Sequence, residues 1–166
     1  MKIIFLDVDG VLNYVMCKAK SPCGAIGVED SCIEVLAKIV DESGACIVLV
    51  SSWKHGWNDD IEKRKANPFI EDLTYLVDAL YKHGIHIIDR TYDGNGDRGY
   101  GISEWLRLHP DITEWAVIDD DMFPDYIQYN IIPRLVQTSF YTGGLKEEHI
   151  EQCLHILNTM EEDHGS

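Results

Sequence analysis

The sequence predicts an α/β fold built around a doubly wound, mainly parallel β-sheet. Short apolar runs alternate with helical segments along the chain, and the runs are continuously apolar instead of alternating with polar residues. Continuous runs are typical of strands that are buried on both faces of a parallel sheet. Strands that alternate with helices are typical of right-handed βαβ units, which build doubly wound sheets.

Five apolar runs are the expected strands. Most of them are rich in Ile, Val and Leu, which favour strands, and a polar or acidic residue follows each one. The expected strands cover residues 2–6, 45–50, 85–88, 115–118 and 135–136.

Four segments with apolar residues at helical spacing are the expected helices. The first begins near Glu29 or Asp30, and the second has Pro68 in its first turn. The third contains Ile102 and Trp105 and ends before a proline, and the fourth is a C-terminal helix over 146–160.

Length and charge limit the class of protein. With 166 residues, 45% of them hydrophobic, we expect a single domain over 1–166 with a sizeable core. There are 14 Lys and Arg against 29 Asp and Glu, a net charge of −15. Such a surface repels phosphates on average, so we expect neither nucleic-acid packaging nor a long nucleic-acid track. No apolar run reaches the ~18 residues of a membrane-spanning helix, so no membrane partner is expected.

The cysteines favour a reducing compartment. The five cysteines are an odd number, and none forms a C-x-x-C pair. The opening MKIIFLD reaches an acidic residue too early for a secretory signal peptide. We therefore expect reduced thiols and a cytoplasmic location.

Acidic and hydroxyl residues follow three of the expected strands. Asp7 and Asp9 follow the first strand, Ser51 and Ser52 follow the second, and three aspartates at 119–121 follow the fourth. Ligands of open α/β sheets bind beyond the carboxyl ends of the strands. These side chains are therefore expected to converge at one edge of the sheet.

The first of these loops has the residue types that phosphoryl chemistry needs. Gly10 lets the backbone turn so that successive N–H groups can bind an anion. Asp7 can point its carboxylate at an electrophile, provided that a cation removes the repulsion between carboxylate and phosphate. Mg²⁺ prefers one or two carboxylates together with waters and substrate phosphate, so Asp7 and the distal aspartates are candidate ligands.

Ordered motifs along the chain resemble the signatures of the haloacid dehalogenase (HAD) superfamily. DVDGVLN at 7–13, VLVS at 48–51 and AVIDD at 116–120 resemble its first, second and fourth signatures. The third signature is a Lys or Arg, for which Arg98 fits best and Lys54 is the rival. The resemblance covers roughly residues 2–145, and four ordered matches are far more specific than one. In finer pattern, including RGYGISEWL after the third strand, the chain is similar to the HAD domains of "Swiss Army Knife" RNA-repair proteins.

The resemblance implies a HAD-like Rossmannoid fold and a phosphatase that works through an aspartyl-phosphate. Asp7 would be the nucleophile, and Asp9 would be the general acid and then the general base. Ser51 would bind a phosphoryl oxygen, and Arg98 would neutralise its charge. An acid at Asp9 also favours phosphate chemistry over carbon–halogen cleavage. The implied ligands of Mg²⁺ are Asp7, the Asp9 carbonyl, and Asp119 or Asp120.

The expected substrate contacts lie in the first two loops, at Gly10, Ser52, Trp53 and Lys54. Trp53 and Trp57 are four residues apart with Lys54 between them, which suits stacking on a nucleotide or RNA end. Aromatic residues at this spacing are also typical of partly buried core positions.

Residues 14–28 are too few for a folded cap domain, so we expect a short flap and no large cap. Capless members of the superfamily often act on large substrates. The expected partner is a phosphorylated substrate, which leaves open a metabolite, a nucleotide, an RNA end or a phosphoprotein.

The glycine-rich segment 93–101 matches parts of two other motifs. G-x-G-x-x-G at 94–99 matches a dinucleotide-binding fingerprint, but it begins too far beyond the expected strand. Acidic residues from Asp93 to Glu104 match ligand positions of a calcium-binding loop, but Arg98 replaces its required glycine. A flexible surface loop is the plainer interpretation, and our preferred one is that the loop presents Arg98 at the rim of the active site.

The sequence therefore predicts a Mg²⁺-dependent hydrolase of phosphomonoesters, with a nucleotide or RNA end among the candidate substrates. The alternative is a catalytically idle HAD-like module that binds a phosphorylated partner or nucleotide. Two complementary acids, Asp7 and Asp9, favour the enzyme, because a module that only binds has no need for the second acid.

Overall fold

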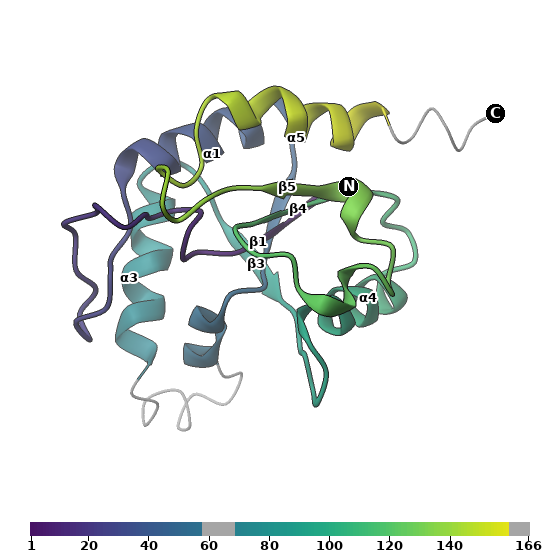
Figure 1. Ribbon diagram of the computed structural model, residues 1–166, viewed down its shortest axis with the longest axis horizontal. Coiled ribbons are helices and arrows are strands. Elements are labelled where there is room, and N and C mark those ends of the chain that lie inside the picture. Colours follow the sequence, from purple (N-terminus) through teal and green to yellow (C-terminus); the bar gives the residue numbers. More distant parts are fainter. Residues whose placement is uncertain (58–68, 160–166) are drawn as a thin grey trace.

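Five parallel strands form one sheet in the order β3-β2-β1-β4-β5 (Figure 1). The computed structural model describes residues 1–57 and 69–159. The strand order runs outward in opposite directions from β1, so the sheet is doubly wound and the predicted fold class is confirmed. The strands are β1 (Lys2–Leu6), β2 (Cys46–Leu49), β3 (Ile87–Arg90), β4 (Glu114–Asp119) and β5 (Leu135–Gln137).

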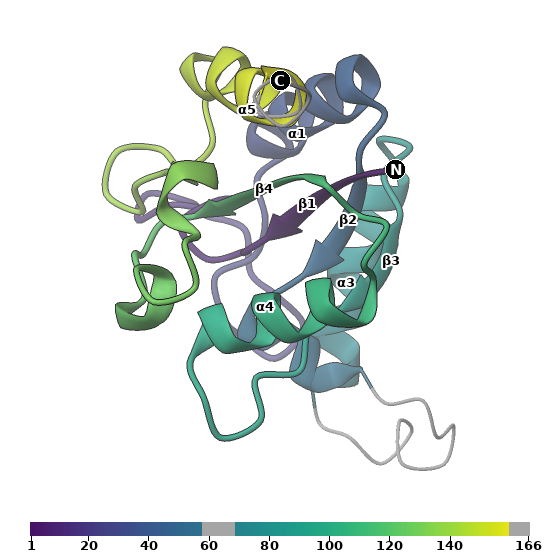
Figure 2. The same cartoon turned by 90° about the vertical axis from the view of Figure 1, so that its right-hand side faces the viewer.

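Helices cover both faces of the sheet (Figures 1 and 2). One face packs against α1 (Asp30–Ser43), α3 (Ile70–Tyr81) and α5 (Glu148–Thr159). The other face packs against α4 (Arg98–Leu108) and the turns that follow β4. Three short 3₁₀ helices complete the described elements: η1 (Ser52–Gly56), η2 (Pro124–Tyr126) and η3 (Ile132–Arg134).

The continuous apolar runs are explained by a sheet that is buried on both faces. In β1, Ile4 and Leu6 belong to the core under α1, whereas Ile3 and Phe5 belong to the core under α4. All four side chains are fully buried, and burying each contributes roughly 1.5–3 kcal/mol. Both alternate sets of positions must therefore be apolar, which removes the polar alternation of a half-exposed strand.

Most predicted boundaries differ from the structure by one or two residues. The second strand is shorter by one residue at each end, the fourth is longer by one at each end, and the last helix begins at Glu148 and not at residue 146. The third strand begins at Ile87 and not at Ile85, because the N–H of Ile85 donates to the Leu80 carbonyl and so belongs to the turn that ends α3. Gly84 allows this turn through its positive φ of 75°. The third helix begins with Arg98 itself, directly after the glycine-rich loop. Pro68 and residue 160, the end of the predicted last helix, lie outside the described residues.

The segment between β1 and α1 crosses to α3. Lys20 and Ile26 form an isolated antiparallel bridge within it. The N–H of Cys23 donates to Asp72, and the N–H of Val28 donates to the Tyr75 hydroxyl. These contacts attach both the tip and the base of the segment to α3.

Within the described residues, the five cysteines form no disulfide. Among the described residues, no helix combines the length and the apolar character needed to span a bilayer.

Candidate active site

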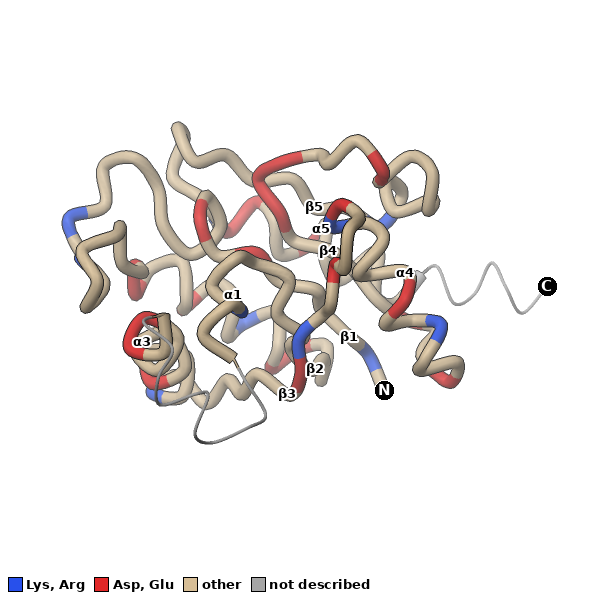
Figure 3. Tube along the Cα trace, turned by 90° about the horizontal axis from the view of Figure 1, so that it is seen from below, with Lys and Arg blue, Asp and Glu red and all other residues tan. Residues whose placement is uncertain are grey.

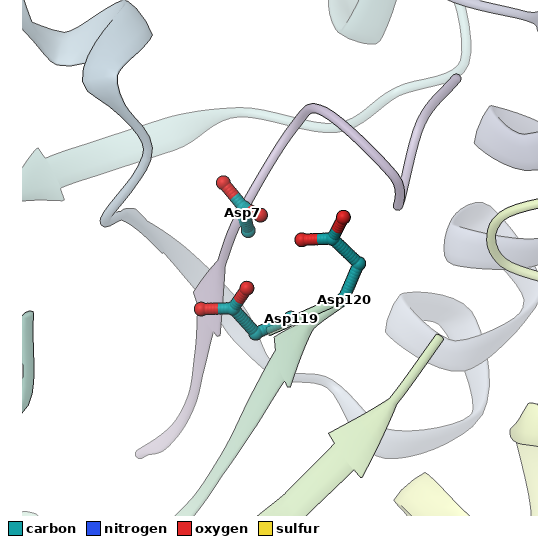
Figure 4. A group of neighbouring side chains, drawn as sticks. All are labelled: Asp7, Asp119 and Asp120. Atoms are coloured by element: carbon teal, nitrogen blue, oxygen red, sulfur yellow. The ribbon is translucent and has the colours of Figure 1, made fainter. Parts of the chain in front are cut away.

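Three carboxylates converge at the carboxyl end of the two central strands (Figure 4). One oxygen from each of Asp7, Asp119 and Asp120 lies within 4.8 Å of the others. The register explains this arrangement, because Leu6 of β1 pairs with Ile118 of β4 and the next residue on each strand is an aspartate. Asp7 is 5% exposed and Asp119 is 0% exposed. The structure thus brings together the side chains of three of the four predicted metal-site residues. The fourth, Asp9, was expected to contribute its carbonyl.

Glycine at position 10 makes the approach of Asp120 possible. Gly10 has a φ of +79°, and a Cβ atom there would lie 2.1 Å from Oδ2 of Asp120. A side chain would therefore clash with the acidic cluster and strain the backbone as well. The Gly10 carbonyl accepts a hydrogen bond of 2.6 Å from the Thr138 hydroxyl, which attaches the first loop to the end of β5. Thr138 was not singled out in the sequence.

Arg98 is in contact with the acidic cluster. Its Nη1 lies 3.1 Å from Oδ1 of Asp7 and 2.8 Å from Oδ2 of Asp119. The guanidinium also lies over the ring of Phe123, with Cζ 4.3 Å from the ring centroid, which is a cation–π geometry. The side chain is 13% exposed, so it is held inside the site and not at a solvent-exposed rim.

Lys54, the rival cation, points elsewhere. Its Nζ donates to the Thr91 hydroxyl at 3.0 Å and to Oδ2 of Asp93 at 2.8 Å. Burial lowers the pKa of Lys54, and its pairing with Asp93 opposes that change. Lys54 therefore attaches η1 to the segment that leads to Arg98.

The first turn of α4 is fixed by Asp125 from η2. The N–H groups of Gly99 and Tyr100 donate to the two carboxylate oxygens of Asp125, at 3.0 Å and 2.8 Å. A carboxylate at a helix N-terminus satisfies free N–H groups and interacts favourably with the helix dipole. A Cβ atom at Gly99 would lie 2.5 Å from Oδ1 of Asp125, so glycine is required for this contact. Asp125 was missed in the sequence, because nothing local links it to α4.

Three donors surround the buried carboxylate of Asp119. The Tyr126 hydroxyl donates at 2.7 Å and Arg98 at 2.8 Å to one oxygen, and the N–H of Asp121 donates at 3.0 Å to the other. These bonds offset the cost of burying the group and fix its orientation. Tyr126 is fully buried and was also missed, since a tyrosine after the fourth strand has no distinctive spacing.

The electrostatics of the cluster are compatible with a bound cation. Burial raises the pKa of Asp7, and the nearby charge of Asp119 raises it further, although Arg98 opposes both. Burial also raises the pKa of Asp120. Burial alone would lower the pKa of Arg98, but attraction to Asp7 and Asp119 outweighs it and the pKa is raised. When all three carboxylates are ionised, they outnumber the one guanidinium and leave an excess of negative charge, which fits a hard divalent cation.

The second loop lies at the same edge of the sheet. The N–H of Val50 donates to the Leu6 carbonyl, so β1–β2 pairing continues to the residue before Ser51. Ser51 is 1% exposed, and its hydroxyl accepts a hydrogen bond of 3.2 Å from the N–H of Trp53. Ser52 is exposed.

Asp9 is exposed, but its carboxylate has protein partners. The indole N–H of Trp53 donates to Oδ2 at 3.2 Å, and the side-chain amide of Asn13 donates to Oδ1 at 2.9 Å. Trp53 itself is 8% exposed, so its ring is mostly covered. The contact of Asn13 was not predicted, although Asn13 lies within the first motif.

The other interpretations of the segment 93–101 find no support in this arrangement. The strand β3 ends at Arg90, so the glycines are not in the first turn after the strand, as a dinucleotide fingerprint requires. Within the described part of the chain, Asp93, Asp97 and Glu104 do not form a converging ligand group, whereas Asp7, Asp119 and Asp120 do.

A doubly wound parallel sheet with an acidic cluster at the ends of its central strands is consistent with a HAD-type domain. The family model of the HAD domain in Swiss Army Knife RNA repair proteins matches residues 3–150, and the chain belongs to this family. The resemblance in the sequence is thereby confirmed. No curated protein matches the chain. Family membership indicates a phosphatase-like module, and the acidic cluster is compatible with Mg²⁺.

Proposed function

We propose that the chain is a Mg²⁺-dependent phosphatase that hydrolyses phosphomonoesters through an aspartyl-phosphate on Asp7. The observation that carries the proposal is the convergence of Asp7, Asp119 and Asp120 with the guanidinium of Arg98. Such a site offers a nucleophile, a place for a cation, and a fixed positive group for phosphate oxygens.

Asp7, Asp119, Asp120 and the carbonyl of Asp9 are the proposed ligands of Mg²⁺. The donor set fits, because all are oxygens and one oxygen of each carboxylate lies within 4.8 Å of the others. Mg²⁺ bound there would screen the negative charge of the substrate phosphate from Asp7 and orient that phosphate for attack.

The first step transfers the phosphoryl group to Asp7. A carboxylate oxygen of Asp7 forms a bond to phosphorus while the bond from phosphorus to the leaving oxygen breaks. The carboxylic acid of Asp9 gives its proton to that oxygen, and the alcohol departs. Arg98 neutralises charge that develops on the phosphoryl oxygens.

The second step restores the enzyme. Asp9, now a carboxylate, takes a proton from a water that attacks phosphorus, and the bond between Asp7 and phosphorus breaks. Inorganic phosphate leaves, Asp7 is a carboxylate again and Asp9 again carries its proton, so the cycle is balanced. Asp7 therefore acts only as the nucleophile, and Asp9 only transfers protons.

The remaining loop residues have proposed roles in binding. The Ser51 hydroxyl binds a phosphoryl oxygen. The N–H of Gly10 donates to Oδ1 of Asn13, so the proposed role of Gly10 is to shape the first loop around the phosphate site. Exposed Ser52 is a substrate contact at the rim. The pairing of Lys54 with Asp93 supports assigning the third signature to Arg98 and gives Lys54 the role of fixing the loop before it.

A nucleotide or the phosphorylated end of an RNA is the substrate class to test first. The name of the family, RNA repair proteins, supports this choice. The net charge of −15 argues against a long RNA track. Acidic residues are scattered along the trace, and basic residues are few (Figure 3). A surface with few basic residues suits recognition of an end group better than recognition of a long strand.

The rival proposal is an idle module that binds a phosphorylated partner. The test is release of phosphate from an aryl phosphate and from a panel that includes RNA with 5′- or 3′-terminal phosphate, each with and without Mg²⁺. Mg²⁺-dependent turnover that Asp7→Asn abolishes supports the enzyme. Binding of these compounds without turnover supports the idle module and contradicts the enzyme.

A further inference from the structure

The carboxylate of Asp9 is held at both oxygens, although the residue is exposed. Trp53 donates to Oδ2 at 3.2 Å and Asn13 donates to Oδ1 at 2.9 Å. An exposed aspartate without such partners would exchange between staggered rotamers. Here two separate segments fix the plane of the carboxylate.

Trp53 is itself fixed by two contacts besides its bond to Asp9. It lies in the first turn of η1, where its backbone N–H donates to the Ser51 hydroxyl. Its ring stacks on the ring of Tyr75 from α3, with centroids 6.4 Å apart and an interplanar angle of 29°. The Tyr75 hydroxyl in turn accepts the N–H of Val28. The indole donor is therefore built into the scaffold and does not depend on a mobile side chain.

Asn13 is fixed as well, and its amide orientation follows from its partners. The side chain is fully buried. Its Oδ1 accepts the N–H of Gly10 at 2.9 Å, while its Nδ2 donates to both Asp9 and the Gly27 carbonyl at 2.9 Å. The reverse orientation would put an oxygen against two acceptors and a nitrogen against a donor. The amide donor must therefore face Asp9.

We propose that Trp53 and Asn13 are positioning residues that hold the Asp9 carboxylate in the orientation for proton transfer. This inference rests on the proposed phosphatase function and adds residues to it. Each carboxylate oxygen has lone pairs beyond the one that accepts the observed bond, so the held group can still carry and release a proton. Because proton transfer depends on geometry, fixing the group ahead of the reaction lowers its barrier.

The inference changes the predicted role of Trp53. A ring that is 8% exposed and stacked on Tyr75 has little free face for a substrate base. Its polar atom points at Asp9 instead. Trp53 acts on the substrate only through Asp9, and an aromatic contact to a base would have to come from another residue.

The test compares Trp53→Phe with Trp105→Phe. Trp105 is a matched control, because it is 6% exposed and its indole N–H also donates to an aspartate, Asp89, at 2.8 Å. Asp89 is not one of the site residues. Each variant loses one buried indole N–H and a similar volume. Turnover is measured with an alkyl phosphate, whose leaving group needs a proton, and with a dinitrophenyl phosphate, whose leaving group does not.

We expect Trp53→Phe to lower kcat for the alkyl phosphate by about 10- to 100-fold, a part of the full general acid–base contribution, with little change in KM. The burst of dinitrophenol should stay close to wild type. The phosphorylated enzyme should then accumulate, because the same carboxylate must activate water in the second step. Trp105→Phe should leave both substrates near wild type. Asn13→Asp, which replaces the amide donor with an acceptor but keeps the partner of Gly10, should repeat the substrate-dependent loss.

Other outcomes overturn the inference. A dinitrophenol burst that slows as much as the alkyl phosphate reaction, with no accumulation of phosphorylated enzyme, means that Trp53 is only structural. A change in KM alone means that it binds substrate. If Trp53→Phe does not fold, benzothienylalanine at position 53 replaces the N–H with sulfur at nearly the same shape, and wild-type kcat on the alkyl phosphate then contradicts the proposal. Absence of turnover in the wild-type protein contradicts the phosphatase function itself, so the two failures are distinguishable.

Discussion

Mg²⁺ should stabilise the folded protein through its acidic cluster. Asp7, Asp119 and Asp120 are held within 4.8 Å of each other and face one guanidinium, so a bound cation relieves repulsion that is absent from the unfolded chain. At a concentration 100 times its dissociation constant, a ligand of the folded state adds about 2.7 kcal/mol to the free energy of unfolding. For a chain of this size, that corresponds to a rise in Tm of about 5–11 °C.

The pH dependence of this effect has a definite sign. Burial, then the charge of Asp119, raises the pKa of Asp7 in the metal-free protein. Its contribution to stability is therefore fully present below the unfolded pKa of about 3.9 and is lost as pH rises through the folded pKa. Mg²⁺ requires the ionised carboxylate, so it competes with the proton. The gain in Tm from Mg²⁺ should grow from mildly acidic to mildly alkaline pH.

The assay is thermal unfolding with and without Mg²⁺ in three buffers, on wild type, Asp120→Asn and Asp41→Asn. Asp120→Asn removes a proposed ligand and should lose most of the gain. Asp41→Asn changes an exposed aspartate of α1 and should keep all of it. No shift in the wild type at saturating Mg²⁺, or an undiminished shift in Asp120→Asn, would refute the reasoning.

Two further predictions concern single residues. Asp9→Asn should lower turnover of an alkyl phosphate by about 10²–10⁴-fold while it keeps the gain in Tm from Mg²⁺, and wild-type turnover on that substrate would contradict its acid role. Arg98→Lys should keep part of the activity and Arg98→Ala should lose considerably more, chiefly in kcat, because a lysine supplies charge without the planar guanidinium. Lys54→Ala should stay active but melt at a lower temperature, since Asp93 loses its partner. If Lys54→Ala is folded but inactive while Arg98→Ala is active, the third signature belongs to Lys54 and not to Arg98.

The fold could be predicted from the sequence because its strands are local and continuous. The runs ending at Leu6 and Ile118 are apolar on both faces, and the residues after them are acidic. Parallel pairing brings those ends together without further information, so the convergence of Asp7 with Asp119 followed from the pattern alone. The start of β3 was predicted two residues too early, because an apolar residue at position 85 is compatible with a strand and also with the turn that ends α3.

The contacts that orient the site could not be predicted, because they depend on the path of a turn or join segments far apart in the chain. Tyr126 reaches Asp119 only through the turn after β4, and Asp125 caps a helix that begins 27 residues before it. The four-residue spacing of Trp53 and Trp57 fits both substrate stacking and core packing. The proposed third role of Trp53, positioning Asp9, depends on a hydrogen bond that the spacing does not indicate. The choice between Lys54 and Arg98 likewise depended on where each side chain finds its carboxylate.

The most direct test of the mechanism is to identify the residue that carries the phosphoryl group. Asp9→Asn is mixed with Mg²⁺ and dinitrophenyl phosphate, quenched in acid and reduced with borohydride, which converts an aspartyl-phosphate to homoserine. Peptide mass spectrometry should find homoserine at position 7, and Asp7→Asn treated in the same way should show none. Turnover without any modification of Asp7, or homoserine at another aspartate, would contradict the proposal that Asp7 is the nucleophile.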